Sequence, residues 1–407
     1  MQSKAGILLC LFSLLPLSAG ADEDDSSFEN AVLNGKTHID FRYRYEWVDS
    51  DALAKDANAS TLRLRINYAT DTWSGWSAFI EADHVAEVLI NDFNSSSGTS
   101  PGREQYPVVA DPRGTDLNQF YFEYAGAADW RFRLGRQRIL LDNQRFVGGV
   151  GWRQNEQTYD GLSATFSGLD RTEVFYSYVA NVNRIFGDRV AAGDHSQDTH
   201  LLNARVKLSA DWAVTGYAYL IDNDDSPALS TNTFGARLSG GIAVDGGKLT
   251  VLGEFASQSD AANSPANFDA DYYRLEIGYD LDNGFGVGVG LESLGGDDGA
   301  AGRAFRTPLA TLHAFDGWAD QFLSTPDAGL EDLFVRFGYK RGPWTLAAVY
   351  HDFAADSGSQ DYGTEVDLSL NRKLGSRYGL LFKFAGFDGA GGYADTSKFW
   401  LMFTGAY

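Results

Sequence analysis

The sequence predicts an all-β fold, a transmembrane antiparallel β-barrel of about 18 strands with short periplasmic turns and long external loops. Three observations predict it. Many segments of about ten residues alternate apolar and polar side chains, which is the length that a tilted strand needs to cross a bilayer. The connections between these segments are alternately short and long, and the final segment ends on the aromatic residue Tyr407.

The first predicted strand, 38–47, shows the two-residue period most clearly. Its odd positions, from Ile39 to Trp47, are apolar or aromatic, whereas its even positions are His38, Asp40, Arg42, Arg44 and Glu46. A period of two separates the faces of a strand. The other strands are expected near 62–68, 76–85, 119–124, 131–139, 158–167, 172–181, 199–208, 212–221, 233–243, 248–257, 271–281, 284–293, 331–340, 344–353, 362–373, 377–387 and 395–407. The segments 76–85 and 172–181 alternate poorly, so their faces are not assigned.

The connections divide into two classes. Those after even-numbered strands are short, as at 70–75, 126–130, 168–171, 209–211, 244–247, 282–283 and 341–343. Those after odd-numbered strands are mostly longer and acidic, as at 86–116, 182–198, 222–232, 258–270 and 294–330. Short turns at one end and long loops at the other are typical of an outer-membrane barrel.

The chain begins with a segment that resembles a secretion signal. Lys4 is followed by an apolar stretch, 7–17, and by the small residues Ala19, Gly20 and Ala21. We therefore expect residues 1–21 to be a signal peptide and 22–407 to form one barrel domain in the outer membrane of a Gram-negative bacterium. The expected partners are outer-membrane lipid, lipopolysaccharide and the barrel assembly machinery.

Charge narrows the choice of solute. The formal net charge of -22 argues against nucleic-acid binding, which needs a basic face. The predicted lumen faces are nevertheless rich in cations: Arg42, Arg44, Arg63, Arg65, Arg131, Arg133, Arg205, Lys207, Arg237, Arg274, Arg336 and Lys383. The acids predicted there are fewer: Asp40, Glu46, Glu123, Glu254, Glu276, Glu365 and Asp367. A positive channel concentrates anions, although these arginines can instead pair with carboxylates on neighbouring strands.

The connection within 135–161 carries four further arginines, Arg136, Arg138, Arg145 and Arg153. It lies at the expected external end of the barrel. We predict that Arg145 and Arg153 extend the basic track to the mouth and that the glycines Gly148, Gly149 and Gly151 permit an inward bend. The acids Asp142, Glu156 and Asp160 of the same stretch are possible partners that would neutralise the arginines.

The longest connection, 294–330, is predicted to fold into the pore as a constriction. It follows a strand in which Gly284, Gly286, Gly288 and Gly290 leave the lumen face bare. Its apolar and basic residues include Phe305, Arg306, His313, Phe315 and Trp318. The alternative is that the glycines only relieve crowding at a bend.

No motif for catalysis or cofactor binding is evident. The six histidines show no metal-ligand spacing, and no nucleophile motif occurs, so an enzyme is not expected. Acidic runs such as 222–225 could hold calcium in a loop, although they lack the glycine and terminal glutamate of a calcium loop. No other cofactor or metal is expected.

Several stretches together resemble the alginate-export family of outer-membrane porins. They are FRYRYEW at 41–47, STLRLRINYAT at 60–70, GRQRILLDNQRFVGGVGWRQNEQTYDG at 135–161, RTPLATLHAFDGWADQF at 306–322, WTLAAVYHDF at 344–353 and RYGLLFKFAGFD at 377–388. The resemblance implies an eighteen-stranded barrel with an arginine-rich conduit for a polyuronate. It also implies candidate contacts at Arg42, Arg44, Arg63, Arg65, Arg136, Arg138, Arg145 and Arg153.

Two features depart from a dedicated alginate exporter. The last periplasmic turn, 374–376, is too short to act as a plug, and the lumen carries several acids. The leading hypothesis is a channel for anionic saccharides such as alginate and uronates, or for small organic acids, through an arginine-lined lumen. The alternatives are a general diffusion porin, an outer-membrane barrel enzyme, and an adhesin whose acidic loops bind a partner.

Overall fold

The computed structural model describes residues 27–297 and 300–407. The predicted signal segment, 1–21, lies outside the described residues. A short helix, α1 (Phe28–Leu33), precedes the first strand, and its N-cap Ser27 accepts a hydrogen bond from the backbone of Asn30. No helix in the described ranges is long and apolar enough to span a membrane.

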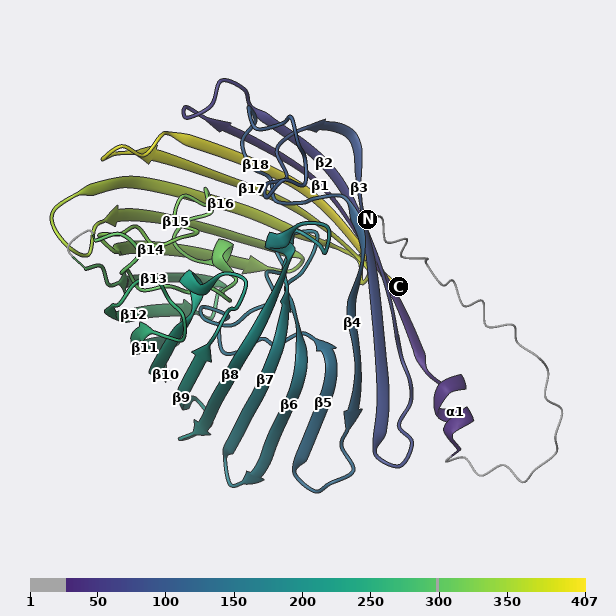
Figure 1. Ribbon diagram of the computed structural model, residues 1–407. Helices are drawn as coiled ribbons and strands as arrows, with labels where there is room; N and C mark the ends of the chain where they lie inside the picture. The colour runs from purple at the N-terminus through teal and green to yellow at the C-terminus, as the bar shows by residue number, and fades with distance from the viewer. Residues whose placement is uncertain (1–26, 298–299) are drawn as a thin grey trace.

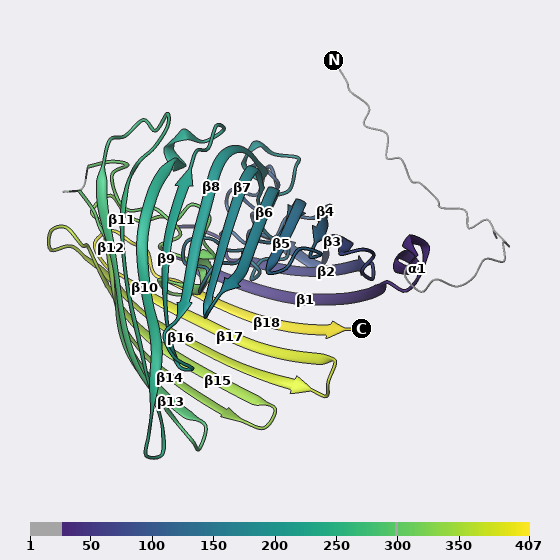
Figure 2. The ribbon, with the colours of Figure 1, turned by 90° about the horizontal axis from the view of Figure 1, so that it is seen from below.

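The rest of the chain forms one eighteen-stranded antiparallel sheet that closes on itself, as predicted (Figures 1 and 2). Closure joins β1 to β18, with Asp40 opposite Ala406. The strands are β1 (Lys36–Ser50), β2 (Ala57–Ala69), β3 (Trp76–Asp92), β4 (Gly114–Tyr124), β5 (Trp130–Gln137), β6 (Thr158–Leu169), β7 (Thr172–Asn183), β8 (Asp194–Lys207), β9 (Trp212–Ile221), β10 (Thr231–Val244), β11 (Gly247–Asp260), β12 (Asp269–Leu281), β13 (Phe285–Leu294), β14 (Leu330–Arg341), β15 (Trp344–Ala354), β16 (Asp361–Leu374), β17 (Tyr378–Gly389) and β18 (Thr396–Ala406). Three one-turn 3-10 helices lie in loops: η1 (Ala191–Gly193), η2 (Pro227–Leu229) and η3 (Leu312–Ala314).

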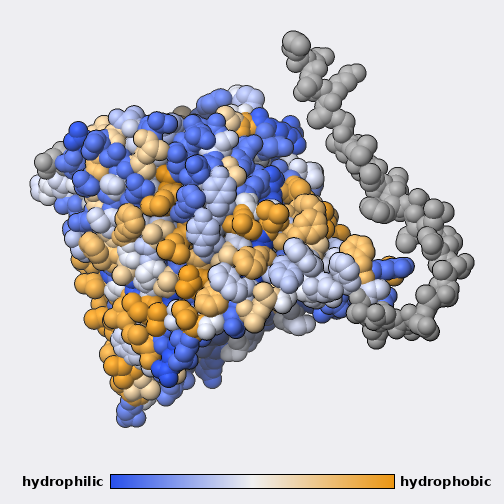
Figure 3. Space-filling view, turned by 60° about the horizontal axis from the view of Figure 1, so that its bottom comes forward, coloured by the Kyte–Doolittle hydropathy of each residue, from blue (hydrophilic) through white to orange (hydrophobic). Residues whose placement is uncertain are grey.

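Each predicted strand segment corresponds to one observed strand, and the short turns gather at one end of the barrel. Outward-facing aromatic residues lie beside these turns. Trp76 contacts Tyr124 with ring centroids 4.8 Å apart, and Phe285 contacts Tyr339 at 4.3 Å. Such a girdle is typical of the membrane interface. Figure 3 shows apolar residues gathered over the barrel wall and polar residues gathered at one end of the molecule.

The hydrophobic core lies inside the barrel rather than between two layers. Loop 138–157 and residues 304–322 of loop 295–329 fold inward (Figure 1), and Val147 of the first forms a β-bridge with Leu309 of the second. Phe146 and Phe305 contact each other and the lumen-facing ring of Tyr272. These loops bury their apolar side chains against the lumen wall because water would otherwise surround them.

Apolar residues that face the lumen explain why the segments 76–85 and 172–181 alternate poorly. Val179 points into the lumen and is fully buried in the same cluster as Phe146 and Val147. Phe79, on the lumen side of β3, stacks on Tyr121 with centroids 5.3 Å apart. An apolar residue can face the lumen wherever a loop or a neighbouring ring covers it.

The bare glycine face of β13 is covered by neighbouring strands, which corrects the reason given for loop insertion. A Cβ atom at position 290 would lie 2.2 Å from the ring of Phe334, and one at position 288 would lie 2.7 Å from Nε of Arg336. Both of these side chains belong to β14. The glycines therefore make room for side chains of the next strand, while loop 295–329 lies inside the barrel for a different reason, its own apolar and ionic contacts.

Candidate functional site in the barrel lumen

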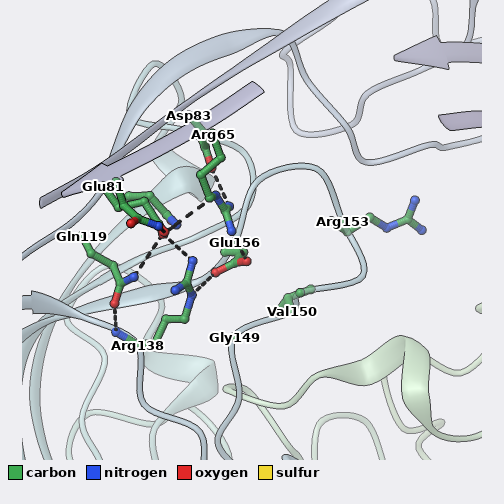
Figure 4. Close-up of polar contacts among 12 residues, drawn as sticks. Arg65, Glu81, Asp83, Gln119, Arg138, Gly149, Val150, Arg153 and Glu156 are labelled. Carbon is green, nitrogen blue, oxygen red and sulfur yellow. Dashed lines mark hydrogen bonds and ion pairs between the residues drawn. The ribbon is translucent and has the colours of Figure 1, made fainter. Parts of the chain in front are cut away.

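The first arginines of the loop that follows β5 are neutralised within their own neighbourhood. Arg136 forms a two-pronged pair with Asp160, at 2.8 and 2.9 Å. Arg138 pairs with Glu156 and with Glu81 on β3, and Arg65 pairs with Glu156 at 2.5 Å and with Asp83 at 2.6 Å (Figure 4). Burial alone would raise the pKa of Glu156, but the two guanidinium groups outweigh it and lower this pKa to about 2.

A β-bulge brings two amide side chains to the same network. The pairing of β3 with β4 shifts between Glu81 and Ala82, so that Asn118 becomes an extra residue in β4. As a result Asn118 and Gln119 both face the lumen, and both donate to Oε1 of Glu81, at 2.7 and 3.0 Å. The Arg65–Glu81–Arg138–Glu156 network holds the root of loop 138–157 on the wall.

Arg145 joins the two inward loops to the wall. Its side chain is only 1 % exposed, and its guanidinium donates to Glu292 on β13 and, at 2.8 Å, to Asp316 of loop 295–329. The ring of Phe315 lies 4.8 Å from the guanidinium carbon. Burial and the nearby Glu292 raise the pKa of Asp316 to about 7, although Arg145 opposes the shift.

Arg153 makes a second connection of the same kind. It contacts Glu46 on β1 at 3.3 Å and Asp320 of loop 295–329 at 3.0 Å. Asp320 also accepts from Lys398 at 2.7 Å and from Nδ1 of His313 at 2.7 Å. Burial raises the pKa of Asp320, but these cationic and hydrogen-bonding partners lower it by more. The pKa of Asp320 therefore lies well below the ordinary value.

His313 lies in the same cluster and is held neutral. Burial lowers its pKa well below the ordinary value despite the nearby Asp320. Its Nε2 lies 2.6 Å from Nζ of Lys383, and its ring stacks on Trp152 with centroids 4.5 Å apart. A neutral imidazole that donates through Nδ1 to Asp320 and accepts at Nε2 from Lys383 satisfies both contacts.

Two arginines of β1 hold the backbone of the first loop. Nη1 of Arg42 donates to the carbonyl oxygens of Gly151, Trp152 and Arg153, at 3.0 to 3.1 Å. Arg44, which is fully buried, pairs with Asp111 at 3.0 Å and lies over the ring of Trp152. Nearby, Arg63 pairs with Asp40 at 2.6 Å.

The glycines of this loop act differently from the prediction. The left-handed backbone conformations belong to Asp142, Gln144 and Val150, not to Gly148, Gly149 or Gly151. Gly148 instead permits close approach between the loops, since a Cβ atom there would lie 2.3 Å from Oγ1 of Thr311. The predicted inward bend is present, but the glycines do not supply its left-handed residues.

The residues predicted for the constriction loop all lie inside the barrel. Phe305 is fully buried against Tyr272, and the backbone of Arg306 donates to Gln258 on β11 at 2.7 Å. The backbone of Trp318 donates to Asp367 on β16 at 3.1 Å. The loop therefore narrows the lumen, while a role of these residues in selecting solutes stays a prediction.

Water-exposed arginines gather in the periplasmic half of the lumen. A cavity of about 430 Å³ is bordered by Arg131 and Arg133 on β5, Arg138, Arg205 on β8 and the segment 139–142 of the inward loop. Arg133 pairs with Glu123 at 2.6 Å. Arg131 and Arg205 are exposed, and neither forms an ion pair with any residue that the structure describes.

The ten predicted path arginines therefore divide by their surroundings. Arg44, Arg63, Arg65, Arg145 and Arg153 are buried. Arg131 is exposed, whereas Arg42, Arg133, Arg136 and Arg138 are half-buried. The sequence pattern missed the partners Asp111, Asp316 and Asp320. The two acids within the apolar segment 306–322 were a signal, because a buried carboxylate requires a cation.

Metal binding receives no support from side-chain geometry. No group of three or more His, Cys, Asp or Glu residues that could hold a metal ion occurs in 27–297 or 300–407. In the loop 222–225, Asp225 accepts from the backbone of Ser196 at 2.7 Å. Calcium binding by this loop stays a prediction.

Comparison with known proteins shows which family and which solved structures this barrel resembles. The sequence profile of the alginate export family matches residues 36–277, which is more than half of the chain. No curated protein matches the sequence. Among solved structures, OccAB4 from Acinetobacter baumannii has a TM-score of 0.73 at 12% identity and covers 91% of this chain and 98% of its own.

Two structures from Pseudomonas aeruginosa share the same fold. OpdK with vanillate has a TM-score of 0.72 at 13% identity and covers 92% of this chain and 99% of its own. OccK8 (OprE) has a TM-score of 0.70 at 14% identity and covers 93% of this chain and 99% of its own. The family match shows that the chain belongs to the alginate-export family. The family and the eighteen-stranded barrel together identify it as an outer-membrane channel of a Gram-negative bacterium, not an enzyme.

Proposed function

We propose that this channel conducts anionic solutes, either carboxylated saccharides such as uronates or small organic acids, and that the lumen arginines attract them. The observation that carries the proposal is the periplasmic cavity, in which Arg131 and Arg205 face water without a carboxylate partner in the described residues. A cation in a narrow, low-dielectric passage raises the local concentration of anions.

The two acids that line the same cavity form no ion pair with Arg131 or Arg205 in the described residues. Glu173 lies directly opposite Arg205 in the pairing of β7 with β8, and Asp142 accepts from Asn203. Arg133 pairs with Glu123 and Arg138 with Glu81 and Glu156, so the lining cations that have no ion pair in the described residues are Arg131 and Arg205. Several weak sites in series suit conduction, because the solute must enter and also leave.

The inward loops favour small solutes over an extended polymer. They fill much of the external half of the lumen with apolar side chains and bridge it with the Arg145 and Arg153 contacts. One structural neighbour is recorded with vanillate, a small carboxylate, which supports an acid of that size. Alginate itself would need these contacts to open.

The test is the reversal potential of the channel in planar bilayers under a potassium chloride gradient. We expect anion selectivity in the wild type and a several-fold loss of the anion-to-cation permeability ratio in the double variant Arg131→Gln/Arg205→Gln. The matched control, Arg303→Gln, alters an external arginine that pairs with Asp297 and should leave selectivity unchanged. A cation-selective wild type would refute the proposal.

A general diffusion porin is the second candidate, because most lumen arginines are neutralised by carboxylates. Arg44, Arg65, Arg145 and Arg153 each contact at least one carboxylate. This reading predicts that glucuronate, benzoate and neutral sugars of equal size enter proteoliposomes at similar rates. The anion channel predicts faster entry of the two acids.

A further inference from the structure

A second cavity, of about 440 Å³, lies at the external mouth and is separate from the periplasmic cavity. It is bordered by the external ends of β1 and β18 and by five loops. Each of these loops contributes side chains from a different part of the chain: 51–56, 93–113, 138–157, 184–193 and 295–329. A solute that arrives from outside would meet this cavity before the inward loops.

The lining of the mouth cavity is unusually apolar for a water-filled entrance. Leu53, Val108 and Leu323 come from three different loops, and they are 38%, 45% and 43% exposed. Ile185 and Phe186 complete the apolar wall. Exposed apolar side chains that converge on one concave site, with a few polar groups among them, are typical of a small-molecule site.

Arg184 is the one lining cation of this cavity that forms no ion pair within the described residues. It follows β7 directly, and its backbone donates to Gly193. It also borders a smaller cavity that contains Asp116, Asp188 and Glu156, yet it forms no ion pair with any of them. Burial lowers the pKa of Arg184, which is the effect expected for a partly desolvated cation without an anion.

The other charges of the mouth cavity are already satisfied. Asp320 is the only acid among the described residues of the lining, and it is bound by Arg153, Lys398 and His313. Arg153 is also bound by Glu46. Asp320 therefore has no free capacity to neutralise Arg184, and the cavity retains a positive charge for a ligand.

The backbone at Val150 is a separate sign of a built site. Val150 lines the mouth cavity with a φ of 50°, although a β-branched residue strongly disfavours the left-handed region. Its amide donates to Oγ1 of Thr311 at 3.1 Å, which helps to hold this conformation. Figure 4 shows Val150 and Arg153 on the same loop, away from the Arg138–Glu156 network. Strained residues of this kind often occur where a loop clamps a ligand.

We propose that the external mouth is a binding site for a small amphipathic carboxylate, with Arg184 binding the carboxylate and the apolar loop residues holding a hydrophobic body such as an aromatic ring. This inference rests on the proposed anion channel and specifies the class of acid that enters it. A sugar acid fits less well, because its hydroxyl groups would face Leu53, Val108 and Phe186 without hydrogen-bond partners.

The experiment measures block of small-ion current in planar bilayers by benzoate, acetate and glucuronate, each added to the external side. We expect benzoate to block at a concentration at least about tenfold lower than acetate or glucuronate. Arg184→Gln should raise the half-blocking concentration of benzoate about tenfold, because it removes a charge-assisted contact. Leu323→Ser should weaken the block by benzoate and leave that by acetate unchanged.

Arg189→Gln is the matched control, since Arg189 lies in the same loop, is exposed and does not line the mouth cavity. Benzoate should block the Arg189→Gln channel at the same concentration as it blocks the wild type. Electrophoretic mobility of the unheated barrel verifies that each variant is folded. Equal block by benzoate and acetate, or an unchanged Arg184→Gln variant, would overturn the inference. Reversal potentials from the same bilayers separate the two proposals. If the channel is anion-selective but benzoate does not block it, only the mouth site is rejected. If the channel is cation-selective, the proposed anion channel is rejected.

Discussion

Replacing Arg145 with Met removes the guanidinium that joins both inward loops to the barrel wall. Methionine preserves much of the apolar contact with Phe315 but none of the ion pairs. Glu292 retains Arg274 and accepts from the hydroxyl of Tyr272 at 3.0 Å. Asp316 is more severely affected, because Arg145 is its only cation among the described residues.

The cost follows from these contacts. Removing one partner of a buried ion pair typically costs about 3–5 kcal/mol. We expect the lower end, about 3 kcal/mol, because Asp316 already has a pKa of about 7 and can take up a proton instead of remaining charged. Since about 1.4 kcal/mol corresponds to a factor of ten, detachment of loop 295–329 should become roughly a hundredfold more frequent.

Two measurements follow the loop at pH 8, where Asp316, with a pKa of about 7, is ionised in the wild type. Chymotrypsin should cleave Arg145→Met faster after Phe305 and Phe322, which are 0% and 4% exposed in the folded protein. Single-channel records should show a larger and noisier conductance, because the loop leaves the lumen. The double variant Arg145→Met/Asp316→Asn should recover most of the protection, since it removes the orphaned carboxylate as well.

The matched control is Arg131→Met, which removes a water-exposed lumen arginine with no ion pair in the described residues. It should change selectivity but not protease sensitivity. The reasoning about the ionic connection is wrong if Arg145→Met shows wild-type cleavage and wild-type conductance noise.

Three further predictions concern the same loops. Gly148→Ala should destabilise the contact between the loops by about 1–3 kcal/mol and increase chymotrypsin cleavage, because the added Cβ atom would lie 2.3 Å from Thr311. The control is Gly151→Ala, which should be neutral because no atom lies within 4 Å of its added Cβ atom. Glu156 has a folded pKa of about 2 against an ordinary 4.5. Its contribution to the stability of the fold, on the order of 3 kcal/mol, is therefore present above pH 4.5 and lost as the pH falls toward 2. Thermal melts of Glu156→Gln should lack this part of the acid dependence. Asp316 has a raised pKa, so its stabilising contribution is complete below pH 3.8 and is lost as the pH rises through about 7. Conductance noise should therefore grow across this pH range in the wild type. An equal rise in Asp316→Asn would show that the titrating group is not Asp316.

Some features could be predicted from sequence because they depend on local periodicity. The alternation in 38–47 assigns Arg42, Arg44 and Glu46 to the lumen face without knowledge of any partner, because successive side chains of a strand point to opposite faces. The pattern of short and long connections likewise identifies the two ends of the barrel. These are properties of neighbouring residues in the chain.

The roles of the lumen arginines could not be predicted in this way. Arg153 meets Glu46 and Asp320, which lie 107 and 167 positions away in sequence. Whether such an arginine faces water or a carboxylate depends on where a long loop folds, and that depends on many contacts at once. The sequence therefore predicted a basic lumen, but not which cations remain free.

The sequence by itself determined the barrel, its strand number, its orientation and its family. Only the tertiary structure decided that Arg145 and Arg153 connect the inward loops, that Arg131 and Arg205 face water, and that Arg184 lines an apolar mouth. The physical reason is that strand periodicity is a local property, whereas the charge state and exposure of a lumen residue depend on groups that closure of the barrel brings together.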